Sequence, residues 1–156
     1  MIENKGSIEE TSSTSCEVDD GGDKLPARYF INVGQADGLH RSLPLMIAGR
    51  QCYTCAQGDT EALESSDPKP YMERITEHCA ETPDYLLPDT PIKEAIFRVL
   101  LAGANNPMLA EEISTILSDK WTMSAYPRDI SPLVIEKLLI HSENYCITRA
   151  SEPLKD

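Results

Sequence analysis

The sequence lacks several features that would point to common classes of protein. Its 156 residues contain no apolar run near the roughly 18 residues that a membrane-spanning helix requires. The first residues have no apolar stretch like that of a secretory signal peptide, so we expect a cytoplasmic protein without a membrane association. Basic side chains are scarce, with 14 Lys and Arg against 26 Asp and Glu and a net charge of −12. This excess disfavours nonspecific binding to DNA or anionic lipid, because both depend on clustered basic residues.

Sequence motifs of common enzymes are also absent. The chain has no phosphate-binding loop, no Gly-x-Gly-x-x-Gly dinucleotide motif, no His-Glu-x-x-His metalloprotease motif and no Gly-x-Ser-x-Gly nucleophile motif. We therefore predict that the protein is not an enzyme.

The distribution of charge suggests a division of the chain. Residues 1–24 carry seven acidic residues and two lysines, and they predict a disordered acidic tail because they bury too little apolar surface to offset their ordering entropy. Residues 25–90 carry ten acidic and five basic residues and hold most of the cysteines. We predict a small metal-binding subdomain there, a helical domain at 91–150 and a short tail at 151–156.

In residues 25–90, we expect short helices and one short strand. Residues 27–33 predict a strand that is ended by Gly34 and the residues that follow it. Apolar residues at helical spacing predict a helix within 39–49, in which Pro44 marks either a start or a kink. A second short helix is predicted at 70–80.

Residues 91–150 show a clearer pattern. Apolar residues repeat every three or four positions between Pro91 and Ala102, and Gly103 follows as a helix terminator. A second helix is predicted at 109–117, a third after Ser131-Pro132, and a closing strand at 145–149. The fold class that we predict is mainly α with a few short strands.

This order of elements resembles a winged-helix domain. The features that carry the resemblance are Pro107 in the turn, Glu111-Glu112-Ile113 in the second helix, and the apolar stripe of the third helix, formed by Ile135, Leu138 and Leu139. The resemblance implies binding to duplex DNA, with the third helix in the major groove.

The third helix, however, departs from the pattern of DNA-reading helices. Between Leu133 and Leu139 it has five large aliphatic residues, and residues 131–141 offer a single lysine, Lys137. A helix that contacts DNA presents more basic and amide side chains. This composition favours packing on two sides or contact with a protein partner, and DNA binding stays an alternative that would use Lys120, Arg128, Lys137 and Arg149.

The cysteines form the most suggestive group. There are five, an odd number without a secretory signal, which argues against a disulfide framework. Twenty-two residues separate Cys52-x-x-Cys55 from His78-Cys79. Tetrahedral zinc takes four nitrogen or sulfur ligands, and the spacing of the first pair places two thiolates within reach of one ion. We predict a zinc site formed by Cys52, Cys55, His78 and Cys79.

The position of His78 leaves alternatives open. Neighbouring residues on a helix point about 100° apart, so His78 and Cys79 can share an ion only at a helix end or a distorted turn. His40 or Cys16 could supply the fourth ligand instead. The cysteines could also hold an iron–sulfur cluster or form a redox-active thiol pair. Buried cysteines beside a coincidental motif are the simplest interpretation, and Cys146 is assigned to the core.

Together, these observations predict a non-enzymatic regulatory or adaptor protein. It would contain a structural zinc site and act through contacts with a protein partner, with a transcription complex as one setting. The alternatives are a DNA-binding transcriptional regulator and an iron–sulfur or thiol redox sensor. The sequence gives no indication of the oligomeric state.

Overall fold

A computed structural model describes most of the chain beyond its first 25 residues. The described ranges are 26–40, 42–57, 67–125 and 127–151. The predicted acidic tail, Cys16 and the end of the chain after Ser151 lie outside them.

The described chain is mainly helical, as predicted. Its α-helices are α1 (Val33–Gly38), α2 (Leu43–Ala48), α3 (Tyr53–Gln57), α4 (Lys69–Glu77), α5 (Ile92–Ala102), α6 (Ala110–Lys120) and α7 (Pro132–Ile140). Two single turns of 3-10 helix are η2 (Cys79–Glu81) and η3 (Glu143–Tyr145). The strands are β1 (Arg28–Ile31), β2 (Met108–Leu109) and β3 (Ile147–Arg149).

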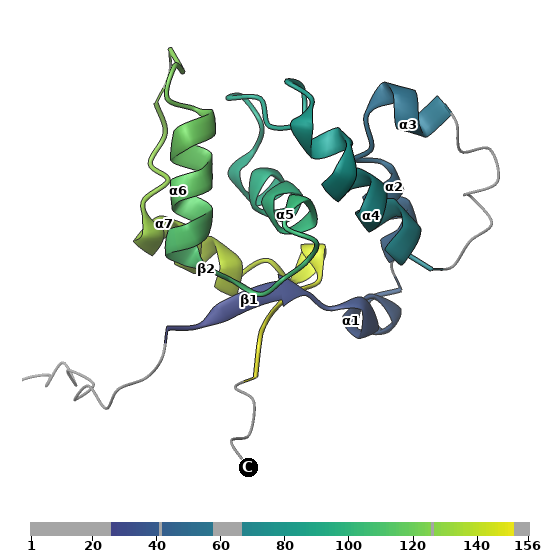
Figure 1. The fold of residues 1–156 in the computed structure, drawn as a ribbon. Helices are drawn as coiled ribbons and strands as arrows, with labels where there is room; N and C mark the ends of the chain where they lie inside the picture. The colour runs from purple at the N-terminus through teal and green to yellow at the C-terminus, as the bar shows by residue number, and fades with distance from the viewer. Residues whose placement is uncertain (1–25, 41, 58–66, 126, 152–156) are drawn as a thin grey trace, which may run out of the picture.

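The three strands form one antiparallel sheet in the order β2-β1-β3. Tyr29 of β1 pairs with Met108 of β2, and Phe30 pairs with Thr148 of β3. The first strand of the described chain therefore lies between two strands that come from its last third. Figure 1 shows β1 running along the lower side of the helices.

This arrangement does not confirm the winged-helix resemblance. The sequence of α5, α6, α7 and β3 matches the order of elements on which the resemblance was based. The partner of β3 is β1, which lies outside the stretch that carries the resemblance. The winged-helix assignment and the boundary between residues 90 and 91 stay predictions.

Helix α5 forms the centre of the core. It packs against α4, α6, α7 and β1, and Figure 1 shows it between α4 and α6. Six of its eleven residues are buried: Ala95, Ile96, Phe97, Val99, Leu100 and Leu101. A single apolar stripe would bury fewer, so α5 is covered on several sides. It begins at Ile92, one residue later than predicted, and no side chain caps it.

The turn after α5 connects this helix to the sheet. Ala104 and Asn105 both have positive φ angles, of 57° and 58°. The Asn105 side chain accepts a hydrogen bond from the Ile31 N–H at 2.7 Å and donates one to the Ile31 carbonyl at 2.9 Å. Asparagine tolerates the left-handed conformation. Its side-chain amide hydrogen-bonds both backbone groups of Ile31, as the backbone of a neighbouring strand would.

Two differences from the prediction concern the short N-terminal helices. Helix α1 was not predicted, because Gly34 was interpreted as a breaker. The Asn32 side chain accepts a hydrogen bond from the Gly34 N–H at 3.0 Å and so caps the first turn. In α2, Ser42 is the N-cap and Pro44 lies in the first turn, so the proline marks a start and not a kink.

Candidate metal centre

The four residues predicted to bind zinc come together in the structure. The ligand atoms of Cys52, Cys55, His78 and Cys79 all lie within 4.8 Å of one another. All three cysteines are free thiols. The group can therefore hold a metal ion, with one sulfur or nitrogen donor from each residue.

The end of α4 explains how neighbouring residues face the same point. The helix ends at Glu77, and His78 has φ −132° and ψ −58°, outside the helical region. Cys79 then begins the separate turn η2. This break in the backbone is the distortion that a shared site requires, because residues within a continuous helix would diverge.

Contacts inside the group show which atoms converge. The Nδ1 atom of His78 lies 3.3 Å from Cys52 Sγ and 3.4 Å from Cys55 Sγ. The backbone N–H of Cys52 donates a hydrogen bond to Cys79 Sγ at 3.2 Å. N–H groups aimed at sulfur stabilise thiolates and orient them, as outer-shell contacts do in metal sites.

The site lies at the surface with one buried member. Cys79 is fully buried and forms the floor, Cys52 and Cys55 are half-buried, and His78 is exposed. Cys52 and His78 also border an open pocket of about 420 Å³, whose other walls include Arg50 and Arg98. Solutes can therefore reach the Cys52 thiol from this side.

The three thiols differ in acidity. A hydrogen bond from the Cys55 backbone is the largest effect on Cys52 and lowers its pKa to about 7. Desolvation and the neighbouring sulfurs raise the pKa of Cys55 to about 12. Burial also raises the pKa of Cys79. In the absence of a cation, desolvation and repulsion between neighbouring thiolates thus oppose the ionisation of all three thiols at once.

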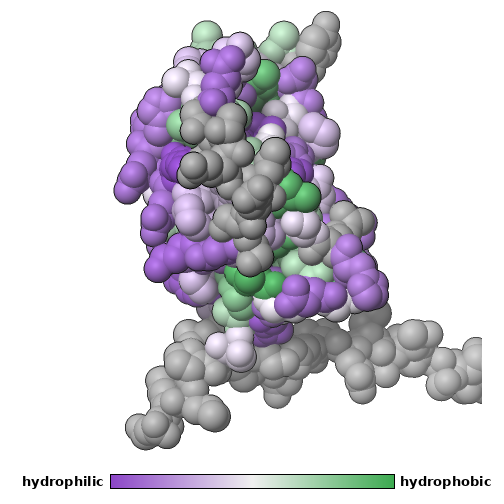
Figure 2. Space-filling view, turned by 90° about the vertical axis from the view of Figure 1, so that its right-hand side faces the viewer, coloured by the Kyte–Doolittle hydropathy of each residue, from purple (hydrophilic) through white to green (hydrophobic). Residues whose placement is uncertain are grey.

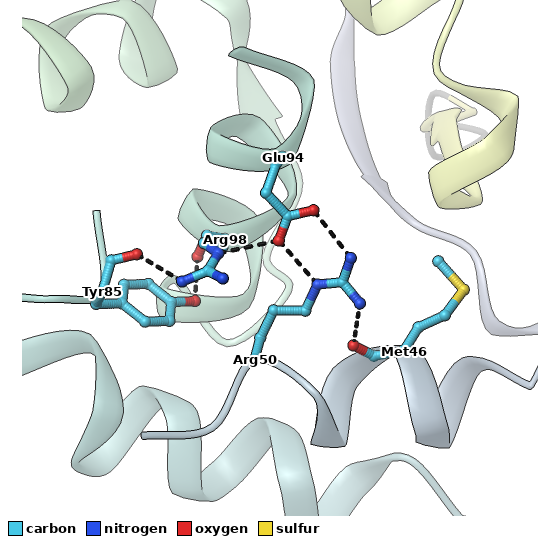
Figure 3. Close-up of polar contacts among 5 residues, drawn as sticks. All are labelled: Met46, Arg50, Tyr85, Glu94 and Arg98. Atoms are coloured by element: carbon cyan, nitrogen blue, oxygen red, sulfur yellow. Dashed lines mark hydrogen bonds and ion pairs between the residues drawn. The ribbon is translucent and has the colours of Figure 1, made fainter. Parts of the chain in front are cut away.

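A charged network fixes the segment that leads into the site. Arg50, two residues before Cys52, donates two hydrogen bonds to the Glu94 carboxylate on α5, from Nε and Nη2 at 2.9 Å each (Figure 3). Its Nη1 donates to the Met46 carbonyl at the end of α2. The guanidinium also lies 5.0 Å from the centre of the Phe97 ring. These contacts hold the start of the cysteine segment against the core.

The same carboxylate binds a second arginine. Arg98 Nε donates to Glu94 Oε1 at 2.9 Å, and Arg98 Nη1 donates to the Tyr85 carbonyl at 2.9 Å (Figure 3). The Tyr85 hydroxyl donates back to the Arg98 carbonyl at 2.6 Å. Burial raises the pKa of Glu94, but the two guanidinium groups outweigh it, and the net shift is downward. No pattern in the sequence predicts this network.

The structure does not place the alternative fourth ligands, His40 and Cys16, in this group. His40 does not belong to the group within the described residues, and Cys16 lies outside them. Cys146 is fully buried in the hydrophobic core, which confirms its predicted place. Within the described residues, the predicted fourth ligand His78 therefore accompanies the three cysteines.

Comparison with known proteins gives no relative from which a role could be transferred. No model of a known family matches the chain, and no curated protein or solved structure matches it. Within the described residues, none of the helices has the length and apolar character needed to cross a bilayer.

Proposed function

We propose that Cys52, Cys55, His78 and Cys79 bind one structural zinc ion. The observation that carries this proposal is the convergence of four donor atoms within 4.8 Å. Around a tetrahedral zinc ion with bonds of about 2.0–2.3 Å, ligand atoms lie about 3.3–3.8 Å apart. Only small side-chain adjustments therefore separate the observed arrangement from a coordinated one.

The compactness of the group favours a single ion over an iron–sulfur cluster. A cluster inserts several iron and sulfide ions between its cysteine ligands and needs a wider ring of donors. Here His78 Nδ1 lies within hydrogen-bonding distance of two sulfurs. Four protein ligands also fill a tetrahedral zinc site and leave no open position for substrate, which supports a structural role in a protein that is not an enzyme.

Elemental analysis of the full chain, purified without added metal, tests the zinc proposal. We expect close to one zinc ion per chain, because structural sites stay nearly filled during purification. Cys79→Ala should lose the zinc, whereas the matched control Cys146→Ala removes an equally buried thiol outside the group and should keep it. Less than roughly 0.2 zinc per chain would contradict the proposal, and iron with visible absorbance would favour the cluster.

We further propose that the protein acts as a regulator or adaptor through contacts made by α7. Leu133 and Ile140 lie seven residues apart on this helix and are 63% and 57% exposed. With seven residues in two turns, both lie on the same side of the helix. Because exposed apolar surface on one side of a helix can form part of a protein interaction site, we assign the contact to this side of α7.

The contacts of Arg128, one of the four basic residues of the DNA-binding alternative, weaken that alternative. Arg128 donates hydrogen bonds to the carbonyls of Thr90 and Pro88 at 2.6 and 2.5 Å, and it lies 4.3 Å from the centre of the Trp121 ring. Its guanidinium is thus engaged in the fold. Arg28 forms an ion pair with Glu112 at 3.3 Å.

A capture experiment from extracts tests the role of α7. The intact protein is compared with a Leu133→Lys/Ile140→Lys variant and with the control Met123→Lys, which changes a side chain that is 94% exposed elsewhere. We expect a partner that the control retains and the α7 variant loses. Equal capture by all three would contradict the proposal, and steeply salt-dependent retention on duplex DNA would favour the DNA-binding alternative.

A further inference from the structure

Helix α3 makes few contacts with the rest of the described chain. None of its five residues is buried, and Tyr53 is 77% exposed. Cys55 is the one member of the helix that is not exposed. The hydrogen bond of the Gln57 side chain goes to Tyr53, within α3 itself. Apolar packing therefore contributes little to the position of this helix.

The cysteines supply the attachment that packing does not. Cys52, at the start of α3, contacts Cys79 and His78, and Cys55 contacts His78. In the described chain, these contacts join α3 to the end of α4 and to η2. On the described part of the face that carries α3 and α4, hydrophilic side chains predominate (Figure 2).

Two of the thiols, those of Cys52 and Cys55, are accessible and lie close to each other. Cys52 and Cys55 are half-buried and lie one helical turn apart, with their sulfurs within 4.8 Å, whereas Cys79 is fully buried. A disulfide needs its sulfurs at about 2.05 Å, a movement that two side chains on a short exposed segment can make. Oxidation is selective for thiolates that solutes can reach.

We propose that Cys52 and Cys55 are a site of oxidation by hydroperoxides, at which disulfide formation expels the zinc and releases α3. This inference rests on the proposed zinc site. One thiolate attacks a peroxide oxygen, the O–O bond breaks, and a sulfenic acid and one water form after protonation. The second thiolate attacks the sulfenic sulfur, the S–S bond forms, and the hydroxyl leaves as a second water.

The reaction balances as two thiolates, one hydrogen peroxide and two protons giving one disulfide and two waters. The two sulfurs lose two electrons, and the peroxide gains them. Zinc then keeps only His78 and Cys79, because a disulfide sulfur is a poor ligand for zinc. Since the same zinc holds α3, oxidation is coupled to release of the helix, and Tyr53 and Thr54 no longer form their part of the pocket wall.

The test treats the zinc-loaded full chain with hydrogen peroxide and follows three quantities. A chromogenic chelator reports free zinc, peptide mass mapping reports the disulfide, and hydrogen exchange reports the amides of residues 53–57. We expect one zinc released for each Cys52–Cys55 disulfide, with faster exchange in α3. Reductant with added zinc should reverse all three changes.

A Cys55→His variant separates zinc binding from oxidation. It offers an imidazole in place of the second thiol of the pair. Its zinc content is measured first, and we expect peroxide to release the zinc that it holds at least tenfold more slowly than from the unmodified chain. Cys16→Ser and Cys146→Ser should behave like the unmodified chain. A chain that binds no zinc overturns this inference and the zinc site together. Zinc that binds but stays bound under peroxide, or is released through a different disulfide, overturns this inference alone.

Discussion

The region around α5 and the region around α3 are held in place by different kinds of interaction. Helix α5 buries six of its eleven residues, and α3 buries none of its five. Packing of apolar side chains fixes the first region, as is usual for a core helix. In the region around α3, contacts among three cysteine sulfurs and one imidazole are found where the other region has apolar packing. In our proposal, a metal ion bound by these four residues positions this short segment, which buries none of its residues fully.

The largest effect is expected from a change in the packed region. Phe97 is fully buried, and its ring centre lies 5.3 Å from that of Tyr145. Phe97→Ala should lower the free energy of unfolding by about 3–5 kcal/mol, through lost burial and the cavity that remains. Denaturant unfolding of the zinc-loaded chain measures this. Leu133→Ala, at a position 63% exposed, is the control and should change stability by less than about 0.5 kcal/mol.

A smaller loss is expected from the network that connects the two regions. Glu94→Gln leaves Arg50 and Arg98 without their shared carboxylate and should cost about 2 kcal/mol at neutral pH, because charge-assisted hydrogen bonds are lost. The folded protein lowers the pKa of Glu94 below its ordinary 4.5. The stability that this carboxylate contributes is therefore present above pH 4.5 and is lost as the pH falls through the lowered pKa.

Unfolding curves of the unmodified chain and Glu94→Gln across pH 3–7 test this dependence. The difference in stability between the two should shrink as the solution becomes more acidic. A difference that is constant over this range would show that the carboxylate charge contributes nothing.

The smallest effect concerns the link between α5 and the sheet. Asn105→Ala removes two hydrogen bonds to Ile31 and places alanine at a positive φ angle, so we expect a loss of about 1–2 kcal/mol. Asn105→Gly separates the two causes, because glycine accepts this φ without strain. A glycine variant as stable as the unmodified chain would show that the hydrogen bonds are unimportant.

Sequence patterns predict the structure correctly where the decisive interactions are local or have a strict spacing. The repeat between Ile92 and Leu100 placed α5 within one residue, because a buried helix face imposes a period of 3.6. The paired spacing of Cys52 with Cys55 and of His78 with Cys79 identified the group that the structure assembles.

Sequence patterns do not predict contacts whose partners are distant in sequence. Helix α3 has no apolar periodicity, and its Cys55 contacts a residue more than 20 positions later. Arg50 and Glu94 are 44 positions apart, so nothing near either residue indicates the ion pair. Helix α1 was missed for a different reason, since the Asn32 cap compensates for the poor helix propensity of Gly34.

Hydrogen exchange with and without zinc tests most directly the claim that coordination holds α3. The zinc-loaded full chain is compared with the same chain after treatment with a chelator. We predict that the amides of residues 53–57 exchange at least tenfold faster once zinc is removed, while those of residues 95–101 in α5 stay protected. Equal protection of α3 in the two samples would contradict the account.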